Sequence, residues 1–165
     1  MKLIGAVTEG SGAVNEDGWG YTGTPDDVSA AWVLDGVTGI NGKNFLSSGT
    51  DAAWLVERAC KHLLELAALD ISLREIMSRL IQFLIVDWLE SSKGLDLPET
   101  YDPPAACLIL AKRYGDSWHT VRLGDSSLLA RAAEGERAIL VASPSNAFDH
   151  WLAAEAAKRR AAGAR

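Results

Sequence analysis

The spacing at which apolar residues recur changes along the chain, and the order of these changes is the feature that most constrains the fold. Segments typical of strands come first, two helical segments follow, and a second group of strand-like segments comes before a last helical pattern. The strand-like segments cover residues 3–7, 19–22, 29–34, 105–111, 118–123, 128–131 and 138–141, and a further helical pattern covers residues 146–162. Strands and helices that are clustered rather than alternating predict an α+β fold, with helices packed on the faces of sheets.

The two central segments carry the apolar stripes of amphipathic helices. The first covers about residues 50–68, where apolar side chains recur at helical spacing. The second begins at Ser72, because Ser72 and Glu75 have the spacing of a capping box. Apolar residues such as Ile81 and Val86 broaden the stripe of the second helix, so we expect that helix to be well buried.

Length and charge limit the classes of protein to consider. The 165 residues suffice for one domain, covering residues 1–165. A net charge of −6 argues against nucleic acid or an anionic membrane as the partner, because phosphate groups are bound largely by Lys and Arg. The longest apolar run, residues 80–86, is far shorter than the roughly 20 residues of a membrane span. We therefore expect a cytoplasmic protein, in which Cys60 and Cys107 are buried thiols rather than a disulfide.

Three acidic turns lie at strand ends, each beside a glycine that lets the backbone approach closely. They are residues 15–18 (NEDG), 35–36 (DG) and 124–126 (GDS). Carboxylate and carbonyl oxygens are the ligands that Mg²⁺ and Mn²⁺ prefer, and loops at strand ends often carry binding sites. Such pairs are also ordinary turn chemistry, so one turn alone carries little information. The combination of three turns in this order favours a cation site.

Two stretches of the sequence resemble the PPM-type (type 2C) metal-dependent protein phosphatases. In the first, residues 15–17 (NED), 30–36 (AAWVLDG) and 37–39 (VTG) look like the first two signatures of that family. In the second, residues 105–111 (AACLILA) and 121–126 (VRLGDS) look like its central strand pair, which ends in Gly-Asp-Ser. The resemblance implies a four-layer α-β-β-α sandwich of antiparallel sheets flanked by helix pairs.

The resemblance also implies a role for each acidic turn. Asp17 would be a metal ligand, Asp35 would bridge two cations, and Gly36 would contribute its carbonyl oxygen. Glu16 would act through a metal-bound water, and Asp125 would lie near a third cation. The cations would be Mn²⁺ or Mg²⁺, and a water shared by two of them would attack the phosphorus of a phosphoserine or phosphothreonine protein substrate. No protein nucleophile is implied.

The sequence departs from the family pattern at three places. Gly12 stands where members usually carry an arginine that grips the substrate phosphate, and glycine cannot replace the bidentate hydrogen bonds of arginine. Val37 and Thr38 stand where many members have histidine and glycine. The family's later Asp-Gly and Asp-Asn motifs do not follow Val141. We therefore expect a fold that is incomplete at its C-terminus, or else an incomplete site.

Three interpretations stay open at this point. The first is a metal-dependent protein phosphatase, which the order and spacing of the motifs favour. The second is a catalytically inactive relative that acts as a binding or regulatory module, because of Gly12 and the missing later motifs. The third is an unrelated α+β domain in which the acidic turns are only turns.

Overall fold

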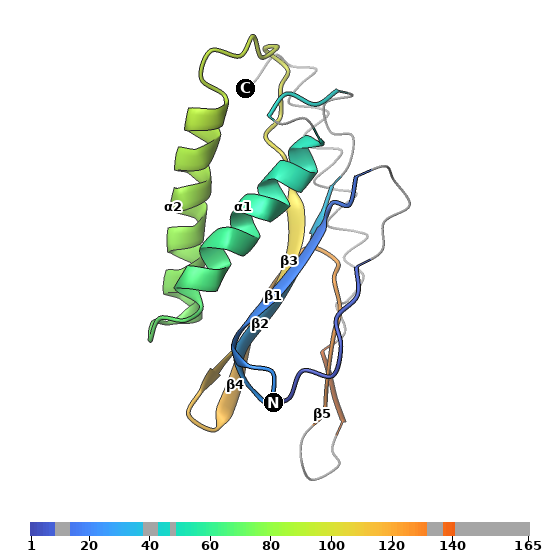
Figure 1. The fold of residues 1–165 in the computed structure, drawn as a ribbon, viewed down its shortest axis with the longest axis vertical. Helices are drawn as coiled ribbons and strands as arrows, with labels where there is room; N and C mark the ends of the chain where they lie inside the picture. Colours follow the sequence, from blue (N-terminus) through green and yellow to red (C-terminus); the bar gives the residue numbers. More distant parts are fainter. Residues whose placement is uncertain (9–13, 38–42, 47–48, 132–136, 141–165) are drawn as a thin grey trace. The chain divides into compact units, whose positions relative to one another are not determined.

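The computed structural model describes residues 1–8, 14–37, 43–46, 49–131 and 137–140 (Figure 1). The chain divides into two units, Met1–Gly124 and Asp125–Arg165. The helix expected at residues 146–162 lies outside the described residues.

The first unit is built on a four-stranded antiparallel sheet with the strand order β1-β2-β3-β4. Its strands are β1 (Asp17–Thr24), β2 (Asp27–Gly36), β3 (Ala106–Tyr114) and β4 (Ser117–Leu123). Between β2 and β3 the chain forms α1 (Asp51–Leu66) and α2 (Leu73–Ser91), and both helices lie on the same side of the sheet (Figure 1). The predicted α+β class, with clustered strands and a helix pair on a sheet, is confirmed.

The core lies between the sheet and the helix pair. Along β2, Trp32 and Leu34 are buried whereas Val33 and Asp35 are exposed, as expected for alternating side chains. The core cluster comprises Ala30, Trp32, Leu34, Val56, Ala59, Leu63, Leu66, Ala67, Ile76, Leu80, Leu108 and Leu110. One face of β2 therefore packs under the helices, and the other face carries Asp35.

Glycines on β1 allow the close packing of this core. A Cβ atom added to Gly18 would lie 2.7 Å from the sulfur of Cys60 on α1. A Cβ atom added to Gly20 would collide with the indole ring of Trp32. Helix α1 and the Trp32 ring therefore occupy the space that side chains at these two positions would need.

Side-chain caps fix the start of both helices. The hydroxyl of Thr50 accepts a hydrogen bond from the Ala53 amide at 3.1 Å, and the hydroxyl of Ser72 accepts one from the Glu75 amide at 3.2 Å. Each cap satisfies a backbone donor that has no partner within its own helix. The predicted start of the second helix at Ser72 is confirmed.

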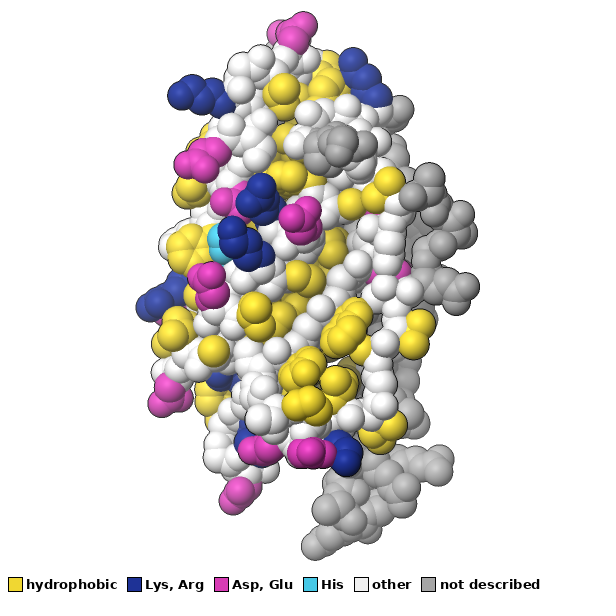
Figure 2. Space-filling model, in the orientation of Figure 1, with side chains coloured by type: hydrophobic (Ala, Val, Ile, Leu, Met, Phe, Trp, Pro, Cys, Tyr) yellow, Lys and Arg dark blue, Asp and Glu magenta, His cyan; other side chains and the backbone are white. Residues whose placement is uncertain are grey.

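The prediction that the second helix would be well buried is wrong. Only Ile76 and Leu80 of α2 are fully buried, because α2 uses one stripe of side chains for packing. The residues that broadened the apolar pattern, Ile81, Phe83, Ile85 and Val86, are between 42% and 52% exposed. Apolar side chains also reach the surface on the face of the molecule seen in Figure 2.

The strand predicted for residues 3–7 is also absent from the structure. Leu3 donates one backbone hydrogen bond to Pro25, and Met1 accepts one from Val28, but these single bonds do not form a ladder. Ile4 and Val7 are 97% and 87% exposed. An apolar run becomes a strand only where a neighbouring strand pairs with its backbone.

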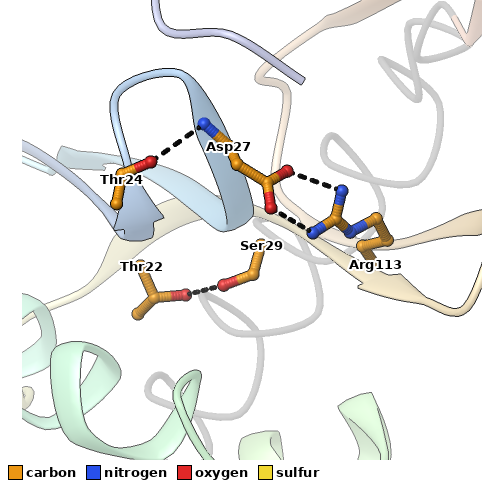
Figure 3. Close-up of polar contacts among 5 residues, drawn as sticks. All are labelled: Thr22, Thr24, Asp27, Ser29 and Arg113. Atoms are coloured by element: carbon orange, nitrogen blue, oxygen red, sulfur yellow. Dashed lines mark hydrogen bonds and ion pairs between the residues drawn. The ribbon is translucent and has the colours of Figure 1, made fainter.

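Polar contacts hold the β1–β2 turn and tie it to β3. Arg113 donates two hydrogen bonds to the carboxylate of Asp27, at 2.8 and 3.1 Å (Figure 3). The Asp27 amide donates to the Thr24 hydroxyl at 3.1 Å, while the hydroxyls of Thr22 and Ser29 lie 2.9 Å apart. The guanidinium of Arg113 holds the pKa of Asp27 below its ordinary value.

The described part of the second unit is one hairpin. Strands β5 (Leu128–Arg131) and β6 (Arg137–Leu140) pair antiparallel, which confirms the last two predicted strands. They form a separate two-stranded sheet, so the strands after α2 do not form one continuous meander. Among the described helices, none is long and apolar enough to cross a membrane.

Candidate metal centre

The strands β1 and β2 bring two predicted metal ligands directly opposite each other. Asp17 begins β1, Asp35 is the penultimate residue of β2, and the two are cross-strand partners. Opposite residues of an antiparallel pair share a face of the sheet, with Cβ atoms about 4.5–5.5 Å apart. Because Leu34 is buried in the core beneath the helices, Asp35 and Asp17 lie on the face turned away from the helices.

This arrangement places two acidic residues at directly opposite positions of a strand pair. Like charges that are directly opposite across a strand pair are destabilising. Asp35 is exposed and Asp17 is partly exposed, so solvent reaches both residues. A divalent cation between the two carboxylates would convert the repulsion into attraction.

Gly36 and Glu16 lie at the same end of the strand pair. The Gly36 amide donates a hydrogen bond to the Glu16 carbonyl oxygen at 3.0 Å. A Cβ atom added to Gly36 would lie only 2.8 Å from that oxygen and 3.1 Å from the Cβ atom of Ala52 on α1. Glycine is therefore required here by the close approach of two backbone segments and a helix. Four of the five predicted metal-site residues, Glu16, Asp17, Asp35 and Gly36, come together in the first unit.

Asp125 stays a prediction as a residue near a third cation. It is the first residue of the second unit and follows Gly124, the last residue of the first. Cys107 of β3 is the cross-strand partner of Asp35, and a Cβ atom added to Gly124 would collide with the Cys107 sulfur. As predicted, Cys107 and Cys60 are thiols, although each is half-buried rather than fully buried.

The donor atoms at this site suit a hard cation in kind. Carboxylate and carbonyl oxygens are the usual ligands of Mg²⁺ and Mn²⁺. Within the described ranges, however, no group of three or more His, Cys, Asp or Glu residues could hold a metal ion. The Asp17 and Asp35 pair therefore supplies only part of a coordination sphere. Gly12 and Thr38, two of the departures from the family pattern, lie outside the described residues.

A cavity of about 420 Å³ opens beside Asp17, between β1 and α1. It is lined by Thr8, Asn15, Asp17, Gly18, Trp19, Ala53, Val56, Glu57 and Cys60. The side chain of Asn15 donates to the Thr8 hydroxyl at 2.7 Å and accepts from the Asp17 amide at 3.0 Å. These two bonds fix the start of β1. Burial raises the pKa of the Cys60 thiol, which keeps it neutral.

Sequence reasoning missed a buried carboxylate close to this site. Asp51, the first residue of α1, is 5% exposed and accepts a hydrogen bond from the hydroxyl of Tyr101 at 3.1 Å. Burial, followed by the charge of Asp51, raises the pKa of Tyr101 to about 12. The sequence alone could predict a favourable interaction of an acidic residue in the first turn with the helix dipole. Its partner lies 50 residues further along the chain, and no local pattern signals such a contact.

The comparison with known protein families agrees with the geometry. A family model described as protein phosphatase 2C matches residues 4–159 of the chain. No curated protein and no solved structure matched the chain. The matched segment covers nearly the whole sequence and includes the acidic turns at residues 15–18, 35–36 and 124–126. The chain therefore belongs to the protein phosphatase 2C family, a family of phosphatases.

Proposed function

We propose that the protein is a metal-dependent phosphatase that hydrolyses phosphoserine or phosphothreonine in protein substrates. The observation that carries the proposal is the direct opposition of Asp17 and Asp35 at one end of the β1–β2 pair. Membership of the protein phosphatase 2C family supports it, because the reaction class follows from the family.

The residues of the site have distinct tasks in this proposal. Asp17 and Asp35 would hold two Mn²⁺ or Mg²⁺ ions, with Asp35 shared between them, and Gly36 would contribute its carbonyl oxygen. Glu16 would act through a water, and Asp125 would serve a third ion. When bound, the cations would supply a water of lowered pKa as the nucleophile and stabilise the phosphoryl oxygens.

The fixed backbone at the end of the strand pair supports these tasks. The cross-strand register holds Asp17 and Asp35 face to face before any ion arrives. The hydrogen bond from the Gly36 amide to Glu16 holds the two backbone segments together at 3.0 Å. Ligands held in place in this way lose little conformational entropy when a cation binds.

We also propose that residues 1–165 act as one domain, working in the cytoplasm on phosphoproteins rather than on nucleic acid or a membrane. The net charge of −6 supports this choice of partner, because an acidic surface repels nucleic acid and anionic lipid.

The test is hydrolysis of p-nitrophenyl phosphate in the presence of Mn²⁺. We expect turnover that is lost on chelation and that falls roughly 100-fold or more in the Asp35→Asn variant, because even residues behind the direct ligands typically contribute 10- to 100-fold. The matched control is Asp27→Asn, the same change at the other end of β2, where the carboxylate pairs with Arg113. Equal activity in the Asp35→Asn variant and the wild type would refute the assignment.

A catalytically inactive binding module is the second candidate, and Gly12 is the observation that favours it. Glycine at the position of the phosphate-gripping arginine removes a bidentate contact with the substrate. Under this alternative, the folded protein binds Mn²⁺ but hydrolyses neither p-nitrophenyl phosphate nor a phosphothreonine peptide. Metal-dependent turnover of either compound excludes it.

A further inference from the structure

We propose that Asp51 is a positioning residue for the metal centre and that Asp51 acts by fixing the backbone of Gly36 and Val37. Asp51 belongs to none of the acidic turns at the strand ends and would touch neither metal nor substrate. The inference rests on the proposed function, because it assigns Asp51 a task at the same site.

Asp51 joins three segments of the first unit through hydrogen bonds. One oxygen of its carboxylate accepts from the amides of Phe45 and Leu46, both at 2.8 Å. The other oxygen accepts from the hydroxyl of Tyr101 at 3.1 Å. The amide of Asp51 donates to the side-chain oxygen of Asn44 at 3.2 Å. The carboxylate therefore links the segment before α1, the first turn of α1 and the loop before β3.

Two of these segments lead directly to the metal site. Ala52 follows Asp51 in the first turn of α1, and its Cβ atom lies 3.1 Å from where a Cβ atom of Gly36 would be. On the other side, the loop that contains Tyr101 ends at Ala105, whose carbonyl oxygen accepts a hydrogen bond from the Val37 amide at 2.9 Å. Gly36 and Val37 are thus held from both sides by segments that Asp51 bonds together.

The chemistry of this junction requires a carboxylate. Two oxygens accept three hydrogen bonds in a place that is 5% exposed, and an amide side chain has only one oxygen. The negative charge lies at the N-terminus of α1, where the helix dipole stabilises it. The pKa of Tyr101 is about 12, so its hydroxyl remains a hydrogen-bond donor at any physiological pH.

The test compares Asp51→Asn and Tyr101→Phe with the wild type. The matched control is Asp87→Asn, because Asp87 is a partly buried carboxylate outside the proposed site, bonded to His62 at 2.8 Å between α1 and α2. Three quantities are measured for each variant. They are the Kd for Mn²⁺ from calorimetry, the hydrogen exchange of the Gly36 and Val37 amides without metal, and the midpoint of urea unfolding.

We expect Asp51→Asn to raise the Kd for Mn²⁺ about 10-fold or more, in line with residues that orient metal ligands. Exchange at Val37 should accelerate in the same variant. Asp87→Asn should lower the urea midpoint without changing the Kd for Mn²⁺ or the exchange rate at Val37. Tyr101→Phe removes a single hydroxyl, so it should give a smaller change in the same direction, and it keeps the test valid if Asp51→Asn does not fold.

Loss of stability alone is the outcome that would overturn the inference. If Asp51→Asn or Tyr101→Phe lowers only the urea midpoint, as Asp87→Asn does, then Asp51 is a structural residue and the inference fails. A wild-type protein that binds no Mn²⁺ would instead refute the proposed function. In that case, amide exchange at Gly36 and Val37 that is the same in Asp51→Asn as in the wild type would refute the positioning role separately.

Discussion

Asp17 and Asp35 are direct cross-strand partners at the end of the β1–β2 pair. The strands thus hold two carboxylates on one face of the sheet, at a place where neither is buried. Such a pair costs stability when it is empty and gains stability when a cation joins it. If a cation binds here, as we propose, the sign of the pair's effect on folding depends on the metal.

Replacing one carboxylate should reveal this change of sign. Asp17→Asn should stabilise the protein in EDTA by about 0.2–1 kcal/mol, because it removes a cross-strand repulsion. With Mn²⁺ present, the wild type should gain thermal stability and the variant should gain much less. Thermal unfolding with and without metal measures both effects. Glu65→Gln, which neutralises an exposed carboxylate on α1, should leave the gain from Mn²⁺ unchanged.

Gly36 should not tolerate even a methyl group. The added Cβ atom of Gly36→Ala would lie 2.8 Å from the Glu16 carbonyl oxygen, and a backbone atom cannot move aside cheaply. We expect a loss of about 1–3 kcal/mol in the free energy of unfolding, together with weaker Mn²⁺ binding. Urea unfolding and calorimetry measure these two losses. Gly5→Ala is the control, because an added Cβ atom meets nothing within 4 Å there; equal stability of the two variants would contradict the prediction.

Lys112 should stabilise the turn between the two helices. Its ammonium group donates to the carbonyl oxygens of Ala67 and Leu69, both at 2.7 Å, and the residue is 6% exposed. Lys112→Met keeps most of the apolar stem but removes both charge-assisted hydrogen bonds, so we expect a loss of about 1.5–3 kcal/mol. Urea unfolding measures the loss. Lys61→Met, on the exposed face of α1, should stay within about 0.5 kcal/mol of the wild type.

Tyr101 should make the protein sensitive to alkali. Burial, followed by the charge of Asp51, raises the pKa of Tyr101 from its ordinary value of 10.0 to about 12 in the folded state, so folding favours the protonated phenol. The stabilisation is fully present below pH 10 and is lost as the pH rises from about 10 to 12. The difference in stability between the wild type and Tyr101→Phe should therefore shrink over this range. A difference that stays constant from pH 8 to pH 12 would contradict the assignment.

Local patterns were enough to predict most of the helices and strands of the first unit, and the acidic turns of the proposed site could be read from the sequence. The pairing of Asp17 with Asp35 was not predicted; it follows from the short turn at residues 25–26 that joins β1 to β2. Patterns failed where the answer depended on distant partners. Residues 3–7 have the composition of a strand but no ladder, and the apolar side of α2 near Ile85 faces outward because one stripe suffices for packing. The contact of Asp51 with Tyr101 spans 50 residues, which periodicity cannot reach.

The two glycines of β1 affect how a scan of single substitutions would have to be read. Gly18 lies against α1 and Gly20 lies against the Trp32 ring, so nearly any replacement forces the helix or the ring away. Both positions would score as essential, although neither offers a side-chain donor to a cation or a substrate. A map of intolerant positions would therefore not separate the tight packing of a helix on its sheet from the chemistry proposed for the adjacent Asp17. Only a scan scored by metal occupancy would tell Asp17 from its neighbour Gly18.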